Sequence, residues 1–72
     1  MKHDQLNHRT LSDFCLELST LLHAGVSVAD GLHLLADGEA DPGLKELYGG
    51  LARQVDDGRS FSAALTDSGA FP

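Results

Sequence analysis

The sequence predicts an all-α fold, an antiparallel helical bundle made of two helix-turn-helix hairpins. The first observation is a repeat: residues 25–28 (Gly-Val-Ser-Val) and Leu32 recur 33 positions later as residues 58–61 (Gly-Arg-Ser-Phe) and Leu65. The second is that the apolar residues upstream of both glycines have helical spacing. The third is that each glycine, which can end a helix, is soon followed by a serine that can cap the next one. Four helices in two hairpins follow from these observations.

The first helix is expected from Thr10 to about Ala24. Residues 10–13 (Thr-Leu-Ser-Asp) resemble a capping box with Asp in place of Glu. The expected apolar face consists of Leu11, Phe14, Cys15, Leu18, Leu21 and Leu22. Because Cys15 lies within this face, we interpret it as a small buried residue and not as a reactive thiol. The polar residues 1–9 are expected to form a flexible N-terminal segment, and residues 10–72 the bundle domain.

The two helices that follow the glycines are predicted to be short. The first of them covers residues 28–37 after a Ser27 cap, and the second begins after Ser60 and ends at residues 67–69. The connection before Ser27 is so brief that the helices on either side must form an antiparallel or steeply crossed hairpin. Gly31 weakens its helix by about 1 kcal/mol relative to Ala unless it permits a close helix crossing.

A third helix is expected over residues 42–57. Asp41 can cap its free amides, and Pro42 suits the first helical position. Its apolar stripe consists of Leu44, Leu47, Tyr48, Leu51, Ala52 and Val55. The adjacent Gly49 and Gly50 would allow a bend or the tight approach of a neighbour.

Composition excludes several classes of function. The chain has 72 residues, enough for one small domain, and a formal net charge of −6 from 5 Lys and Arg against 11 Asp and Glu. Such a charge repels phosphate backbones and anionic lipid headgroups, so we expect no nucleic-acid partner. The apolar runs are far shorter than the roughly 20 residues that span a bilayer. With a single cysteine there is no disulfide framework, and we expect no cofactor.

No set of side chains forms a convincing catalytic constellation. Cys15 and His23 lie about 12 Å apart along one expected helix, too far to touch. His23 and His33 flank the first turn and are able to approach each other across the hairpin, but polar histidines at helix ends are common. The remaining candidate metal ligands are His3, Asp4 and His8. Because a flexible segment supplies no fixed geometry, we predict neither a metal site nor an enzyme.

Two stretches resemble the type II secretion system protein F family, which includes the inner-membrane platform proteins of type II secretion and type IV pilus machines. Residues 14–28 resemble its opening helix and Ala-Gly turn, and residues 51–65, which end in Val-Asp-Asp-Gly-Arg-Ser-Phe-Ser-Ala-Ala-Leu, resemble its junction between helices three and four. The Phe71-Pro72 pair fits the position that follows. The resemblance implies a cytoplasmic domain of six antiparallel helices, of which residues 10–72 hold the first four, as a truncated domain.

The resemblance also implies a function. It predicts a non-catalytic scaffold at the cytoplasmic face of the bacterial inner membrane that docks the assembly ATPase and other inner-membrane components, and that meets the membrane only through transmembrane segments absent from this chain. The acidic residues that we consider candidates for partner contacts are Glu17, Asp30, Glu46, Asp56 and Asp57. The last two stand at a helix C-terminus, where the helix dipole disfavours negative charge.

A domain that lacks its last helices should leave apolar stripes uncovered, so we expect self-association into a dimer or larger assembly. The residues that we expect at this interface are Leu18, Leu22, Leu47 and Leu51. One alternative function stays open. A helix-turn-helix period of 33 residues is close to that of known solenoids, which favours a free-standing helical adaptor or repeat module.

Overall fold

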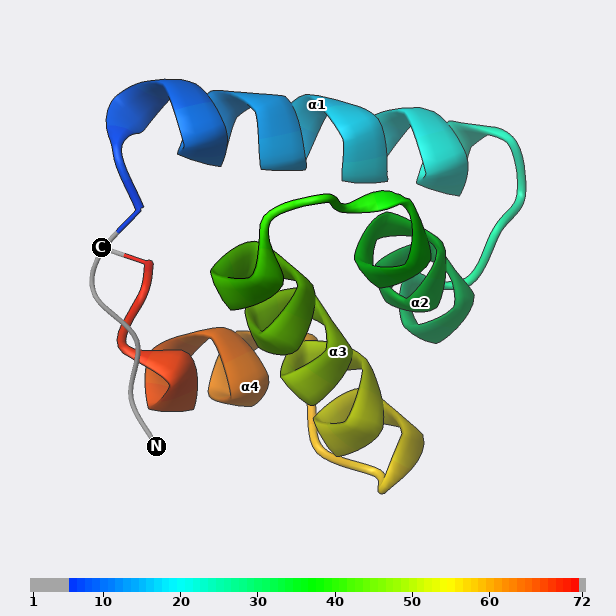
Figure 1. Ribbon diagram of the computed structural model, residues 1–72. Helices are drawn as coiled ribbons and strands as arrows, with labels where there is room; N and C mark the ends of the chain where they lie inside the picture. The colour runs from blue at the N-terminus through cyan, green and yellow to red at the C-terminus, as the bar shows by residue number, and fades with distance from the viewer. Residues whose placement is uncertain (1–5, 72) are drawn as a thin grey trace.

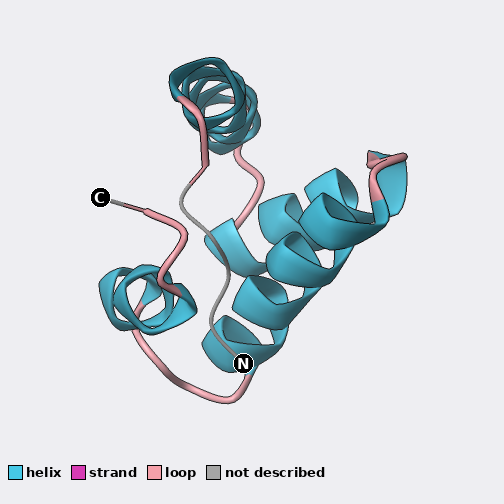
Figure 2. Ribbon diagram, turned by 60° about the vertical axis from the view of Figure 1, so that its left-hand side comes forward, coloured by secondary structure: helices cyan, strands magenta, loops and turns pink. Residues whose placement is uncertain are grey.

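The computed structural model describes residues 6–71 and contains four helices. They are α1 (His8–His23), α2 (Val28–Gly38), α3 (Pro42–Asp56) and α4 (Phe61–Ser68). The all-α prediction is confirmed, and among the described residues no strand occurs. Figure 1 shows α1 running across one side of the molecule, with α2 crossing beneath it at a steep angle, so the first hairpin is crossed. In Figure 2, α3 lies beside α2 and α4 stands apart from α1.

The repeat in the sequence is also a repeat in the backbone. Gly25 and Gly58, which follow α1 and α3, have φ angles of 90° and 98°, a left-handed conformation that glycine adopts without a Cβ clash. In both turns the N–H of the residue after the glycine donates to the carbonyl five residues earlier, at 3.0 Å. This is the Schellman arrangement, which satisfies the last carbonyls of a helix. Ser27 and Ser60 then cap α2 and α4 by accepting from N–H groups three residues on, at 3.2 and 3.1 Å.

The start of α1 differs from the sequence prediction. The N-cap is Asn7, whose Oδ1 accepts a hydrogen bond from the Thr10 N–H at 2.8 Å, so Thr10 lies inside the helix. The Leu6 N–H donates to the carbonyl of Ala70 at 2.9 Å, which ties the start of the described chain to its end. The predicted cap at Thr10 was therefore wrong, and residues 6–9 belong to the folded part. The other residues of the expected flexible segment, which include His3 and Asp4, lie outside the described residues.

The core lies where α1, α2 and α3 meet. Leu32 and Leu51 are completely enclosed, and the Phe14 ring stacks on the Tyr48 ring with centroids 5.1 Å apart. The Phe71 ring, which follows α4, also packs against the Phe14 ring, with centroids 5.2 Å apart. Aromatic pairs at these distances add to the energy of burial. The C-terminal residues therefore help to join α1 to the rest of the fold.

Three of the four residues predicted at an oligomer interface belong to this core. Leu18, Leu47 and Leu51 are only 5%, 3% and 1% exposed, so their assignment to an uncovered stripe was wrong. Leu22 is 41% exposed. Cys15 is exposed as well, against expectation. The reason is that α1 packs through a narrower stripe than its apolar face, and the side of the helix that carries Cys15 and Leu22 is left uncovered.

Gly31 in α2 and the Gly49-Gly50 pair in α3 differ in how closely other atoms approach them. A Cβ on Gly31 would lie 3.0 Å from Cδ1 of Leu18, so this glycine allows α1 and α2 to cross closely, as the sequence suggested. A Cβ on Gly49 or Gly50 would meet no atom within 4 Å. The tight approach considered for that pair is therefore absent, and α3 continues through it.

Candidate functional site

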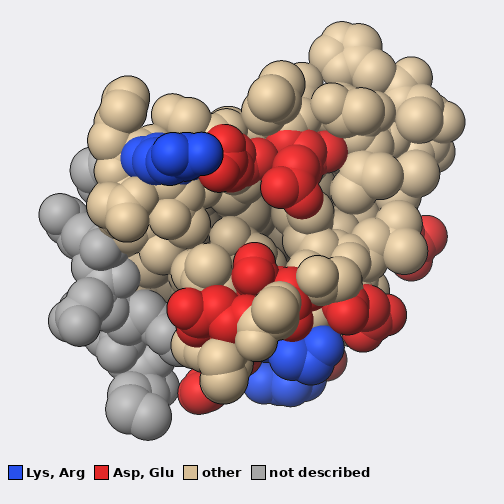
Figure 3. All heavy atoms as spheres, turned by 45° about the horizontal axis from the view of Figure 1, so that its top comes forward, with Lys and Arg blue, Asp and Glu red and all other residues tan. Residues whose placement is uncertain are grey.

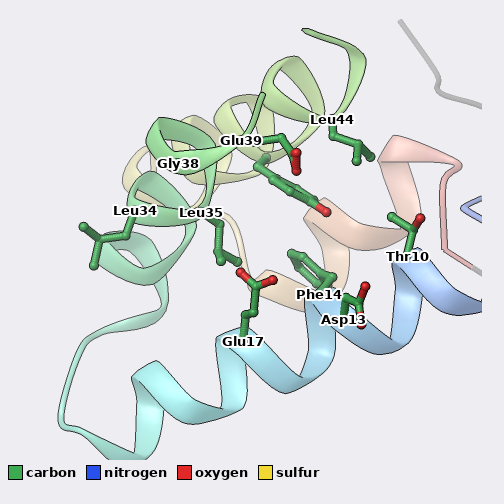
Figure 4. Close-up of a pocket in the computed structure, with 10 residues that line it drawn as sticks. Thr10, Asp13, Phe14, Glu17, Leu34, Leu35, Gly38, Glu39 and Leu44 are labelled. Atoms are coloured by element: carbon green, nitrogen blue, oxygen red, sulfur yellow. The ribbon is translucent and has the colours of Figure 1, made fainter. Parts of the chain in front are cut away.

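A hollow of about 270 Å³ separates α1 from the α2–α3 hairpin. We call it the acidic cleft. Its lining residues are Thr10, Asp13, Phe14, Glu17, Leu34, Leu35, Gly38, Glu39, Leu44 and Tyr48. Figure 4 shows Asp13 and Glu17 projecting from α1 on either side of Phe14, with the Glu39 carboxylate on the opposite wall. Carboxylates from two separate elements thus converge on one opening.

The fold explains why these carboxylates gather. Asp13 and Glu17 are four residues apart, so they share one face of α1, where like charges destabilise a helix by about 0.2–0.5 kcal/mol. Glu39 is the C-cap residue of α2, and the crossing of α1 over this hairpin brings it to the other side of the cleft. Figure 3 shows acidic side chains on both sides of a hollow on this face of the molecule. The electrostatic potential in the cleft is therefore negative.

Tyr48 forms the inner wall of the acidic cleft. Its side chain is buried, with the whole residue 6% exposed, and among residues 6–71 no hydrogen bond to its hydroxyl is found. Burial, together with the negative charges of nearby carboxylates, raises the pKa of Tyr48 to about 12. Those carboxylates, in order of effect, are Glu39, Glu17, Asp13 and Asp41. Tyr48 is thus a neutral hydroxyl, free to donate or accept, beside several negative groups.

The carboxylates of the cleft have no positive partner in the described part of the chain. Between residues 6 and 71, the ion pairs found are His33 with Asp56, at 2.7 Å, and Arg59 with Asp67. Neither pair involves a residue of the acidic cleft. The cleft therefore has both negative charge and hydrogen-bond acceptors available to a ligand.

Of the predicted partner-contact residues, only Glu17 lies in the acidic cleft. Asp30 is exposed in the first turn of α2, where its charge suits the positive helix end. The Asp56 carboxylate lies 2.7 Å from Nε2 of His33. Nδ1 of His23 lies 2.8 Å from the carbonyl oxygen of Ser19 in its own helix. The two histidines therefore contact other groups, and the approach between them that the sequence allowed does not occur. The five candidates do not form one surface.

Glu46 and Asp57 line a second hollow, of about 510 Å³, along α3 and α4. Arg53 and Arg59 line it too, so its charges are mixed. Within it the Gln54 side-chain oxygen is buried without a hydrogen-bond partner in the described chain. Because positive side chains already stand beside the acids here, this hollow attracts a cationic ligand less strongly than the acidic cleft does.

A third hollow, of about 260 Å³, has a mostly apolar lining between α1 and the C-terminal part of the chain. The residues that form it are Phe14, Cys15, Leu18, Ser19, Leu22, His23, Phe61, Leu65 and Phe71. Another apolar area surrounds Leu16 and Leu34, which are 69% and 52% exposed. Apolar side chains remain accessible on both of these surfaces.

Sequence reasoning missed Asp13, Glu39 and Tyr48 as members of a site. The sequence places Asp13 in the expected capping box of residues 10–13, and Tyr48 in the apolar stripe of the third expected helix. One signal was present: two like charges, Asp13 and Glu17, stand four residues apart around a core aromatic, an arrangement that costs stability. Glu39 gave no such signal, because its place depends on how the hairpin meets α1.

The part of the chain that the structure describes is a small helical domain with an acidic face. In residues 6–71 no three His, Cys, Asp or Glu side chains are placed to hold a metal ion. A comparison with protein families matches residues 14–72 to the type II secretion system (T2SS) protein F family. The chain therefore belongs to this family, whose members are inner-membrane-associated, non-catalytic platform domains.

The other comparisons found no counterpart. No curated protein and no solved structure matches the chain. No helix in the described range 6–71 has the length and apolar character needed to cross a membrane.

Proposed function

We propose that this domain is a scaffold at the cytoplasmic face of the inner membrane in a type II secretion or type IV pilus machine. It docks the assembly ATPase and other inner-membrane components. Membership of the protein F family supports the platform role. The observation that carries the docking role is the acidic cleft, in which carboxylates from two elements converge without a positive partner among the described residues.

Electrostatics supports this assignment. A net charge of −6 on 72 residues gives the domain a field that attracts positive surfaces and repels nucleic acid and anionic lipid. Complementary charge raises the rate of encounter and fixes the orientation of docking. A protein partner with a basic surface fits the domain better than any other class of ligand.

The docking role is tested by isothermal titration of the chain with the assembly ATPase of the same machine. We expect a saturable complex whose dissociation constant rises with NaCl concentration, because the contacting charges are exposed and are screened by salt. Replacing Glu17 by Gln should weaken binding. Absence of any heat of binding at low salt, with both proteins folded, would contradict the docking role.

The alternative of an open helical repeat fits the fold less well. In a solenoid each unit contacts only its neighbours, and the two ends are far apart. Here the Leu6 N–H bonds to the carbonyl of Ala70, and Phe14 of α1 packs on Phe71 after α4. The chain closes on itself, which favours a discrete domain.

Self-association remains part of the proposal, through a different surface from the one expected. The apolar hollow that contains Cys15, Leu22 and Phe71 is accessible, whereas Leu18, Leu47 and Leu51 are enclosed. Covering this hollow with a second copy would remove apolar area from water at about 25 cal/mol per Å². Sedimentation velocity should show a dimer that Leu22→Asp dissociates, and a wild-type monomer at millimolar concentration would contradict self-association.

A further inference from the structure

We infer that the acidic cleft is a recognition site for a single arginine side chain presented by a protein partner. This inference rests on the proposed docking function and names the chemical group that the domain recognises. Three features of the cleft carry it: the placement of its carboxylates, the Tyr48 hydroxyl and the size of the hollow.

The carboxylates offer acceptors from two directions. Asp13 and Glu17 reach the cleft from α1, and Glu39 reaches it from the α2–α3 connection (Figure 4). Glu39 accepts only a long hydrogen bond, 3.5 Å, from the Asp41 N–H. The Asp41 carboxylate caps α3, its Oδ1 accepting from the Gly43 and Leu44 N–H groups, and because Asp41 does not line the cleft, it contributes charge to the cleft and no acceptor inside it. Acceptors on opposed walls suit a group that donates in several directions.

The Tyr48 hydroxyl is the second, independent observation. The Tyr48 side chain is enclosed, with the whole residue 6% exposed, its hydroxyl is accessible from the cleft, and no hydrogen bond to this hydroxyl is found among residues 6–71. Its side chain lines the cleft. A ligand that donates to the carboxylates and also contacts this hydroxyl would give it a hydrogen-bond partner within the cleft.

The size and shape of the hollow select the ligand. About 270 Å³ is slightly below the usual range for small-molecule pockets, roughly 300–1,000 Å³, and suits one long side chain. A guanidinium has five donors in a rigid fork and matches carboxylates in a bidentate way, whereas an ammonium is a strongly hydrated point charge. The apolar side chains of Leu34 and Leu44 in the lining also give the aliphatic stem of an arginine a surface to pack on.

The test is a titration of the full 72-residue chain, labelled with nitrogen-15, with the peptide Ac-Gly-Arg-Gly-NH₂. We expect saturable shifts of the backbone amides of Asp13, Glu17, Glu39 and Tyr48, with a dissociation constant of about 1–10 mM, as for one charged side chain. The same peptide with citrulline, which has the shape of arginine without its charge, should cause no saturable shift. The lysine peptide should bind at least about threefold more weakly.

Two substitutions and a matched control locate the site. Glu17→Gln should weaken arginine binding by about fivefold or more, and Tyr48→Phe by about threefold, the loss of a single hydrogen bond. Glu46→Gln makes the same chemical change in the second hollow and should alter the dissociation constant by less than about twofold. The amide spectrum of each variant shows directly whether it is folded.

Several outcomes would overturn the inference: no saturable shift with the arginine peptide, equal binding of the citrulline peptide, or equal weakening by Glu17→Gln and Glu46→Gln. Shifts of the cleft amides that depend on protein concentration alone would mean that a second copy supplies the cation, and would also overturn it. Arginine binding without ATPase binding supports the cleft assignment and contradicts the proposed partner. ATPase binding without arginine binding overturns only the cleft assignment.

Discussion

Tyr48 combines two roles that are usually separate in a small domain. Its ring is part of the core, stacked on Phe14, while its hydroxyl stands at the wall of a cleft surrounded by negative charge. Both burial and charge oppose the formation of a phenolate, because the ionised form would be poorly solvated and repelled. The pKa of Tyr48 therefore depends on the negative charges that surround the cleft.

This coupling predicts how stability depends on pH. The pKa of Tyr48 is about 12 in the folded chain and 10.0 in the unfolded chain. Between these values the folded state retains a proton that the unfolded state has lost, so the free energy of unfolding falls as pH rises from 10 towards 12. The Tyr48→Phe variant has no hydroxyl to ionise, so its free energy of unfolding lacks this decrease. In urea unfolding at pH 9 and pH 11, the free energy of unfolding of the wild type should fall relative to that of the variant at the higher pH, and an unchanged difference would contradict the account.

Gly31 provides a second prediction at the scale of one residue. Gly→Ala in a helix normally stabilises by up to about 1 kcal/mol. At Gly49, where a Cβ meets nothing, Gly49→Ala should show this gain. At Gly31 a Cβ would press on the buried Leu18, and overpacking costs about 1–3 kcal/mol, so Gly31→Ala should destabilise by about 1 kcal/mol. Thermal unfolding checks the pair, and equal gains at both positions would show that α1 and α2 do not cross closely.

Among the elements, α1 is the one whose limits matter most, because it carries two of the three carboxylates of the acidic cleft. Asn7 fixes its start one turn before the position that Thr10 suggested. Because α1 begins at His8, its first turn contains no acidic residue. Asp13 and Glu17 stand in the middle of the helix and not at its positive end. Their mutual repulsion is therefore not relieved by the helix dipole, whose effect is confined to the first turn.

The cap of α1 gives a prediction for this element. Asn7→Ala should destabilise the domain by about 1 kcal/mol, since it leaves the Thr10 N–H without its acceptor. Thr10→Ala, at the position that the sequence had suggested as the cap, should cost clearly less than that. Urea unfolding of both variants decides between the two positions of the N-cap. A larger loss of stability for Thr10→Ala than for Asn7→Ala would indicate that Thr10 is the N-cap.

The sequence predicted what is determined locally. The glycine turns and serine caps depend on residues a few positions apart, and they appear where expected after α1 and α3. The sequence-based predictions were wrong where a residue's burial depends on tertiary packing. Cys15 and Leu18 both fit the apolar face of α1, but only Leu18 is covered by the core. The acidic cleft is of this second kind, because Glu39 meets Glu17 only through the crossing of the hairpin.

In the whole molecule, the closure of the chain on itself holds α1 in place. Packing of Phe71 against Phe14 and the bond between Leu6 and Ala70 join the two ends of the described chain. Both ends lie on the same side in Figure 1. Since α1 forms one wall of the acidic cleft, this closure also maintains the shape of the cleft.

Loss of the closure should therefore affect stability and the cleft together. Phe71→Ala removes a partly buried ring and should destabilise the domain by about 2 kcal/mol, less than a fully buried Phe would. It should also broaden the amide signals of Asp13 and Glu17, because α1 loses one of its contacts. Chemical denaturation and the amide spectrum check both effects. A loss of stability without any change in α1 would mean that the C-terminal residues do not support the cleft.

The central claim, that the acidic cleft is where this platform domain docks its partner, is tested most directly by photo-crosslinking in cells that contain the assembled machine. Leu34 is 52% exposed and lies at the rim of the cleft, so a photoreactive phenylalanine in its place would stand beside a partner that docks there (Figure 4). Ser62, exposed on α4, provides the control position. The account predicts an adduct with the assembly ATPase from position 34 and none from position 62. Adducts of equal yield from both positions, or from position 62 alone, would contradict it.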